Sequence, residues 1–278
     1  MADRLRPLWD FDDLDGSEQR FRLQLEQEET DAGRAEVLTQ LARVEGLRGD
    51  FDASERLLRD ADALAGSSPV VLVRIELERG RRLRSSGDAV AALPLFESAF
   101  ARAVEAGEHY LAGDAAHMAA LAAPDREGME AWTQRGLDLG EREADAAYWA
   151  GPPLNNLGWT YHDAGEHEPA LDVFERALEV RELDPDNQAA IALGRYGVGT
   201  TLRSLGRAEE AVAMLEPAVA WAEESGTPDA WFHEELAEDY AAAGRTDEAR
   251  TQAERALKLI DGDAEPKRAA RLQTLAGG

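Results

Sequence analysis

The sequence predicts an all-α solenoid, a fold in which about six repeated helix pairs stack one after another. The first observation is a set of turn glycines whose successive spacings are 38, 78, 41 and 38 residues, where 78 spans two repeats: Gly49, Gly87, Gly165, Gly206 and Gly244. A fixed spacing of this size is typical of a repeat protein. The second observation is composition, because hydrophobic residues make up 44% of the chain but aromatic residues only 6%, which favours helices.

The best-formed helix pair lies at residues 154–181 and provides the third observation. Apolar residues mark one face of each of its two helices at helical spacing: Leu154, Leu157, Gly158 and Tyr161, then Ala170, Phe174, Ala177 and Leu178. Small residues stand where the two helices must approach closely, and large ones where the next pair must be reached. Because one pair cannot bury both of its faces, the stretch requires neighbours of its own kind.

The other pairs follow from the same periodicity. The six repeats are expected at residues 33–66, 69–106, 108–142, 152–183, 188–225 and 229–261. The third is degenerate, and Pro124 and Asp125 take the place of its turn glycine. The run Val70–Val73 is the best candidate strand, but it follows Pro69 and continues into charged residues, which favours a helix that begins there.

The two ends of the chain differ from the repeats. Residues 1–16 are expected to form an acidic arm, or else a disordered tail. The arm would dock three apolar side chains on the first helices: Trp9, Phe11 and Leu14. Ser17 is predicted to cap an extra helix that ends near Thr30. A more polar helix at 265–275 caps the chain, so residues 17–275 are expected to form one solenoid domain.

The charge balance argues against two classes of partner. The chain has 56 acidic and 30 basic residues, a formal net charge of −26, which disfavours nucleic acid and anionic membranes. It contains no cysteine, so disulfides, thiolate metal sites and cysteine nucleophiles are excluded. No stretch is apolar enough to span a membrane, and the N-terminus lacks the apolar core of a leader peptide, so a cytoplasmic location is expected.

One order of residue types recurs among the pairs. In the fourth pair it reads large residue, Leu-Gly, aromatic, turn Gly, Ala, aromatic, Ala: Leu154, Leu157, Gly158, Tyr161, Gly165, Ala170, Phe174 and Ala177. The fifth pair follows with Val198, Gly199, Leu202, Gly206, Ala211, Leu215 and Ala218. Over residues 33 to 260 this pattern resembles the tetratricopeptide repeat family, whose repeats normally have about 34 residues. The resemblance implies a right-handed superhelix in which the first helix of each pair lines a concave groove.

Residues on the groove side are expected at fixed offsets from the Gly158-type packing residue: Arg43, Arg74, Arg81, Arg84, Asp114, His117, Asn155, Trp159, His162, Tyr196 and Arg203. Arginine forks and an asparagine amide suit a carboxylate, a phosphate or an acidic peptide. Trp159 and Tyr196 offer rings for stacking on a planar group. Two alternatives stay open: the arginines pair with neighbouring acids such as Glu76 and Glu78, and Trp159 packs in the core.

No arrangement of catalytic residues or metal ligands stands out. His162 and His167 are five residues apart across a turn, which is not the helical i, i+4 spacing of a metal site. The glycine-rich run from Gly194 to Gly199 lies inside a predicted helix with no strand before it, which argues against a phosphate-binding loop.

The sequence therefore predicts a non-enzymatic module, with no metal or cofactor, that binds a peptide segment or a partner protein in its groove. The partner is expected to carry acidic or carboxylate groups, and the oligomeric state is left open. The alternative is a regulatory sensor whose superhelix closes around a small ligand or a signalling peptide. A third hypothesis, an enzyme that uses Asp114, His117 and His162, has no nucleophile–base spacing to support it.

Overall fold

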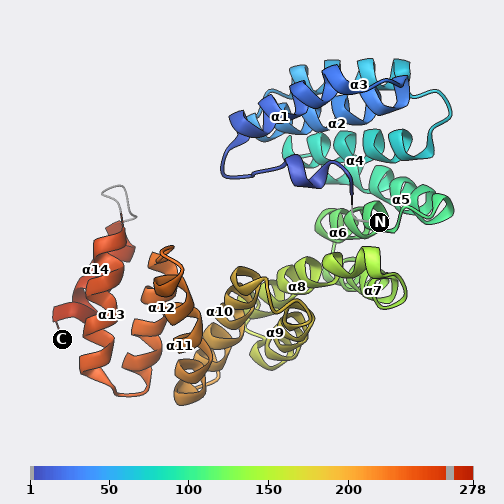
Figure 1. The fold of residues 1–278 in the computed structure, drawn as a ribbon. Helices are drawn as coiled ribbons and strands as arrows, with labels where there is room; N and C mark the ends of the chain where they lie inside the picture. The colour runs from blue at the N-terminus through green and yellow to red at the C-terminus, as the bar shows by residue number, and fades with distance from the viewer. Residues whose placement is uncertain (1–2, 261–265, 278) are drawn as a thin grey trace. The chain divides into compact units, whose positions relative to one another are not determined.

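The computed structural model describes residues 3–260 and 266–277 (Figure 1). Every regular element in these ranges is a helix, which confirms the all-α prediction. The elements are η1 (Arg6–Leu8), α1 (Leu14–Gln27), α2 (Asp31–Arg48), α3 (Phe51–Leu64), α4 (Pro69–Ser85), α5 (Ala89–Ala106), α6 (His109–Ala122), α7 (Arg126–Arg142), η2 (Ala144–Ala150), α8 (Gly151–Asp163), α9 (His167–Glu182), α10 (Gln188–Ser204), α11 (Ala208–Glu224), α12 (Ala230–Ala242), α13 (Thr246–Leu259) and α14 (Pro266–Gly277). The predicted repeat end at residue 261 and cap start at residue 265 lie outside the described residues.

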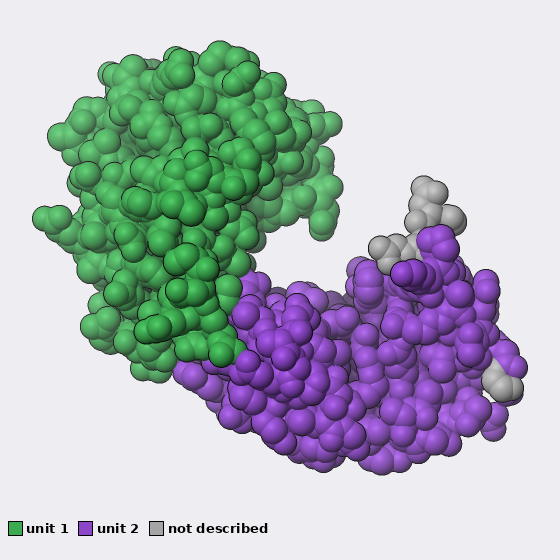
Figure 2. Space-filling view, turned by 180° about the vertical axis from the view of Figure 1, so that it is seen from behind, with its two compact units in different colours: residues 1–153 green, residues 154–278 purple. Residues whose placement is uncertain are grey.

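Neighbouring helices pack in chain order, as a solenoid requires. The pairs α2–α3, α4–α5, α6–α7 and α12–α13 are in close contact, and α10 packs on both α9 and α11. The chain folds as two compact units, Met1–Pro153 and Leu154–Gly278 (Figure 2). That residues 17–275 act as one domain stays a prediction. None of the described helices combines the length and apolar character that crossing a membrane requires.

The conformation of the turns explains why a glycine recurs between the two helices of most repeats. Gly49 ends α2 with a φ of +83°, a left-handed conformation that other residues adopt only with strain. Asp50 then caps α3, its carboxylate accepting a hydrogen bond from the Ala53 amide at 2.8 Å. Where the third repeat lacks a glycine, Asp125 caps α7 in the same manner by accepting from the Gly128 amide at 2.8 Å.

Two local details differ from the sequence-based expectation. Ser17 is not the cap of α1, because Asp13 accepts a hydrogen bond from the Gly16 amide at 2.9 Å and starts the helix earlier, at Leu14. Ser17 is buried instead, and its hydroxyl donates to the Asp10 carbonyl at 2.7 Å. The linker before the fourth repeat also contains an element that the periodicity did not predict, the 3-10 helix η2.

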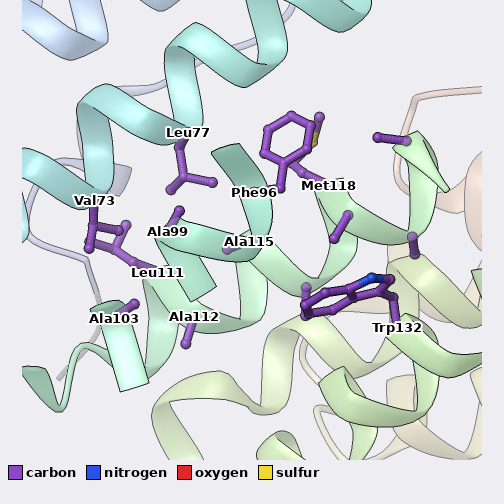
Figure 3. Packing of buried hydrophobic residues seen from close by; sticks show 14 of the residues in the cluster. Val73, Leu77, Phe96, Ala99, Ala103, Leu111, Ala112, Ala115, Met118 and Trp132 are labelled. Atoms are coloured by element: carbon purple, nitrogen blue, oxygen red, sulfur yellow. The ribbon is translucent and has the colours of Figure 1, made fainter. Parts of the chain in front are cut away.

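Small residues let the paired helices approach until aromatic rings fill the space. In unit 1, a Cβ added to Gly80 of α4 would lie 2.4 Å from the Phe96 ring of α5, so only glycine fits there. Phe96 is fully buried in a core that extends through Leu77, Leu111 and Trp132 (Figure 3). In unit 2, Gly158 meets the Phe174 ring in the same way, and a Cβ added there would lie 2.6 Å from that ring. This contact fixes which face of each first helix points away from the core.

We expect Gly80→Ala to lower the free energy of unfolding by about 1–3 kcal/mol, because the added methyl group overpacks the contact with Phe96. Gly46→Ala is the matched control. Its Cβ would have only Ser54 Oγ nearby, at 3.8 Å, so the variant should gain about 0.4–1 kcal/mol from reduced freedom of the unfolded chain. Urea unfolding followed by circular dichroism measures both, and equal stabilities of the two variants would contradict the packing described above.

Candidate functional site

The inner face of unit 1 gathers charged side chains from three first helices. Arg74, Glu78 and Arg81 are spaced by four and three residues on α4, so they share one face of that helix. Arg43 comes from α2 and Asp114 from α6, and all five residues line one pocket. The repeat offsets in the sequence placed Arg43, Arg74, Arg81 and Asp114 on the groove side, and the structure brings these four together.

The N-terminal arm, dark blue in Figure 1, covers this face. Asp3 accepts a hydrogen bond from Arg74 at 2.5 Å, and Glu36 of α2 accepts another at 3.2 Å. Trp9 is 7% exposed, and its indole donates to Gln40 at 2.9 Å. Leu5 and Trp9 pack with core residues of α1 and α2. The arm is therefore ordered and supplies an acidic partner for Arg74.

Arg81 is also paired within the chain. Its guanidinium donates to both Glu78 and Asp114. Burial alone would raise the pKa of Asp114, but Arg81 and Arg43 outweigh it and hold that pKa below its ordinary value. Arg84 lies further along α4, where it donates to the Leu121 carbonyl at 3.2 Å. The alternative that groove arginines pair with neighbouring acids thus describes Arg74 and Arg81.

Arg43 differs from its neighbours because no ion pair or hydrogen bond of its guanidinium is found among the described residues. Its Nε is buried without an acceptor. The guanidinium carbon lies 5.3 Å from the ring centres of both Trp9 and Phe11, which stack on each other with centroids 4.9 Å apart. Burial lowers the pKa of Arg43, and the charge on Arg81 lowers it further. This charge is stabilised by cation–π contact and by the nearby charges of Glu78 and Asp114, neither of which is hydrogen-bonded to it.

The pocket beside Arg43 has a volume of about 130 Å³ and is lined by the arm, α2, α4, α6 and η2. Its lining includes three further aromatic rings, Tyr110 of α6 and Tyr148 and Trp149 of η2. The indole nitrogen of Trp149 is buried and has no acceptor. His117 stacks on Trp149 at 5.7 Å, and burial lowers its pKa to about 4, so it is neutral at pH 7.

The aromatic side of this pocket was not among the residues expected from the sequence. Tyr148 and Trp149 fall in the linker between the third and fourth repeats, outside the positions that the repeat offsets identify. Two adjacent aromatic residues in a chain with few of them were the available clue. The arm was expected to dock on the first helices, but nothing in the sequence indicated that Asp3 would reach Arg74.

In unit 2, a second group of predicted residues comes together around Trp159 of α8. The Trp159 ring lies 4.9 Å from Phe174, 5.4 Å from His162 and 5.9 Å from Tyr196. It is partly exposed, so it both packs on the core and presents a surface. His162 forms a hydrogen bond of 3.1 Å with Ser204, and burial lowers its pKa. Nearby, Asn155 accepts from Arg181 at 3.2 Å.

Arg203 of α10 is enclosed by acids of α12. It lies 2.7 Å from Glu235, 3.0 Å from Glu238 and 2.9 Å from Asp239. Asp239 is fully buried, and burial raises its pKa to about 7 despite the contact with Arg203. Burial also raises the pKa of Glu238. Arg203, like Arg74 and Arg81, is therefore satisfied by the chain itself.

Comparisons with known proteins identify the class to which this arrangement belongs. Three stretches match models of the tetratricopeptide repeat, at residues 35–60, 154–183 and 188–261. The apo form of RapI is similar, with a TM-score of 0.73 at 12% identity over 98% of this chain and 80% of that one. A tetratricopeptide repeat protein from Parabacteroides merdae ATCC 43184 has a TM-score of 0.51 at 14% identity, over 99% and 96% of the two chains. No curated protein sequence matches. The chain belongs to the tetratricopeptide repeat family.

We expect Arg74→Ala to lower the free energy of unfolding by about 3–5 kcal/mol, because it leaves the Asp3 carboxylate, whose side chain is only 9% exposed, without a counter-charge, while Glu36 keeps its pair with Arg4. Arg79→Ala on the same helix is the control. Arg79 pairs at 3.1 Å with Asp62, whose side chain is 47% exposed, so its loss should cost less than about 1 kcal/mol. Chemical unfolding measures both, and a small effect of Arg74→Ala would contradict the described pairing.

The raised pKa of Asp239 makes stability depend on pH. Its pKa in the folded chain is about 7 against an ordinary 3.8, so the folded state favours the protonated form, and stability is lost as the pH rises from about 4 to about 7. Arg203, Glu235 and Glu238 face it. The Asp239→Asn variant lacks this titration. Its free energy of unfolding, relative to that of the wild type, should therefore be higher at pH 8 than at pH 5 by on the order of 2 kcal/mol. Melting temperatures measured from pH 5 to pH 8 test this prediction. Asp247→Asn, at an exposed site, is the control, and its melting temperature should change with pH as that of the wild type does.

Proposed function

We propose that this protein is a non-enzymatic interaction module that binds an extended segment of a partner protein along the inner helices of unit 2. The observation that carries the proposal is the N-terminal arm in unit 1. There, the chain's own non-repeat segment lies on the inner face, buries Leu5 and Trp9, and donates a hydrogen bond to Gln40. The inner face of a repeat unit in this protein thus holds a segment from outside the repeats, here one with a short 3-10 helix.

The partner's chemistry follows from the side chains around Trp159. The rings of Trp159 and Tyr196 are partly exposed and provide apolar area for an aromatic or aliphatic side chain. Toward α12, Arg203 faces the carboxyl groups of Glu235, Glu238 and Asp239, and the side chains of Glu235 and Glu238 are 10% and 18% exposed. Carboxyl groups thus outnumber the one cation around Arg203. The expectation of an acidic partner rested on unpaired arginines, and in unit 2 an apolar segment with a basic residue fits better.

A second function, that of a sensor for a small ligand, is favoured by one observation in unit 1. The pocket under the arm is enclosed on several sides and contains the unpaired guanidinium of Arg43. At about 130 Å³ it is far smaller than the sites of about 300–1,000 Å³ that bind drug-sized ligands. A sensor of this kind would bind a molecule of few atoms in unit 1 while unit 2 binds the partner.

Peptide selection tests the first function. A library of random twelve-residue peptides is panned on the whole protein, and the affinity of the selected peptides is measured by fluorescence polarisation. We expect sequences with aromatic and basic residues, and at least tenfold weaker binding to Tyr196→Ala, because the variant removes one of the two rings proposed to contact the peptide.

Leu183→Ala is the matched control, since it also truncates an apolar side chain, 82% exposed and just after α9. It should bind as the wild type does, and circular dichroism should show both variants fully helical. Selection of acidic peptides, or equal binding to Tyr196→Ala, would contradict the proposal.

A further inference from the structure

The pocket of unit 1 contains two buried hydrogen-bond donors that nothing in the described chain satisfies. They are Nε of Arg43 and Nε1 of Trp149, which come from α2 and from η2. Trp149 is 9% exposed, so its indole has little access to bulk water. A buried donor without an acceptor costs about 1–3 kcal/mol, and more when the group is charged. The site is therefore complete only when an acceptor occupies it.

The rings beside Arg43 do not replace that acceptor. Trp9 and Phe11 stabilise the positive charge through their faces, an effect worth about 0.5–2 kcal/mol. They offer no lone pair to the N–H groups in the plane of the guanidinium, which are arranged as a fork for the two oxygens of a carboxylate. Arg74 and Arg81 show what Arg43 lacks, because in the same pocket the guanidinium group of each donates hydrogen bonds to carboxylate oxygens.

The charge of the pocket limits the ligand to one negative charge. Asp3, Glu78 and Asp114 line the same space and would repel a dianion. Arg74 and Arg81 are occupied by these acids, which leaves the partly exposed Arg6 and the buried Arg43 as the other cations of the lining, so that four cations face three acids. A monocarboxylate meets both conditions. Inorganic phosphate meets them less well, because a large part of it is dianionic at neutral pH.

Size and lining determine the rest of the molecule. A volume of about 130 Å³ is close to the engineered cavity of about 150 Å³ that accepts benzene, so a ligand of about ten non-hydrogen atoms fits and a peptide does not. Tyr110 and Trp149, whose rings meet edge to face at 5.5 Å, provide flat apolar contact. Burial raises the pKa of Tyr110 to about 12, which keeps its hydroxyl protonated as a further donor.

We propose that this pocket binds a small aromatic or branched monocarboxylate, with the carboxylate held by Arg43 and the Trp149 indole, and the apolar body between the rings of η2, α6 and the arm. The inference rests on the second function proposed above, ligand sensing, and gives it a ligand class. It does not depend on peptide binding by unit 2. Because Trp9 and Phe11 belong to the arm, the bound ligand would also hold the arm in place.

Three probes separate the contributions: benzoate, benzyl alcohol as a neutral molecule of similar shape, and inorganic phosphate. Differential scanning fluorimetry and isothermal titration calorimetry on the whole protein measure binding. Benzoate at ten times its Kd should raise Tm by about 3 °C. Benzyl alcohol and phosphate should each bind at least tenfold more weakly. No shift with benzoate, or equal binding of benzyl alcohol or phosphate, would overturn the proposal.

Variants assign the contacts. Arg43→Gln should weaken benzoate binding at least tenfold, and Trp149→Phe, which keeps a ring but removes the N–H, several-fold. Arg84→Gln is the control on the same inner face; its arginine contacts the Leu121 carbonyl rather than the pocket, so affinity should stay within twofold.

Undiminished binding by either Arg43→Gln or Trp149→Phe would refute the assigned geometry, and Trp149→Phe decides the matter if Arg43→Gln does not fold. Peptide binding by unit 2 is measured separately, with Tyr196→Ala. If benzoate does not bind to unit 1, the proposal of peptide binding by unit 2 is therefore unaffected.

Discussion

The close approach of the two helices in the second and fourth repeats is the constraint on which the other features depend. Gly80 against Phe96, and Gly158 against Phe174, leave no room for a Cβ, which fixes the rotation of α4 on α5 and of α8 on α9. Once the glycine side of α4 is fixed toward α5, the directions of all other side chains on α4 are fixed as well. That is why Arg74 and Arg81 point to the inner face and why Asp114 of α6 meets Arg81 there.

The excess of negative charge then decides what those arginines do. With 56 acidic residues to 30 basic ones, an arginine on the inner face has a carboxylate of the next helix or of the arm within reach. Arg203 has three such neighbours and Arg74 has two. Buried pairs of this kind contribute little net stability compared with apolar residues, but breaking one is costly. These ion pairs therefore orient neighbouring helices more than they stabilise the fold. Arg43 differs from the paired arginines because it has no such partner among the described residues.

How much was predictable from sequence depended on whether a feature followed the repeat. The periodicity placed a repeat at residues 108–142, where the structure has α6 (His109–Ala122) and α7 (Arg126–Arg142), although this third repeat is degenerate. It also placed Arg43, Arg74, Arg81 and Asp114 on one face. It did not reveal which arginine would be paired, because a long flexible side chain reaches acids on several helices. Features outside the repeat were the hardest: Asp13 displaced Ser17 as the cap, and η2 brought Trp149 into the pocket without any periodic pattern.

The central claim is that Arg43 is an incompletely satisfied cation in a pocket that the chain's own arm closes. A crystal structure of the protein grown with benzoate tests it most directly. We predict a benzoate carboxylate within about 3 Å of the Arg43 guanidinium and of the Trp149 indole nitrogen, with the arm ordered above it. A structure in which Arg43 pairs with a carboxylate of the chain, or in which saturating benzoate leaves the pocket unfilled, would contradict that claim.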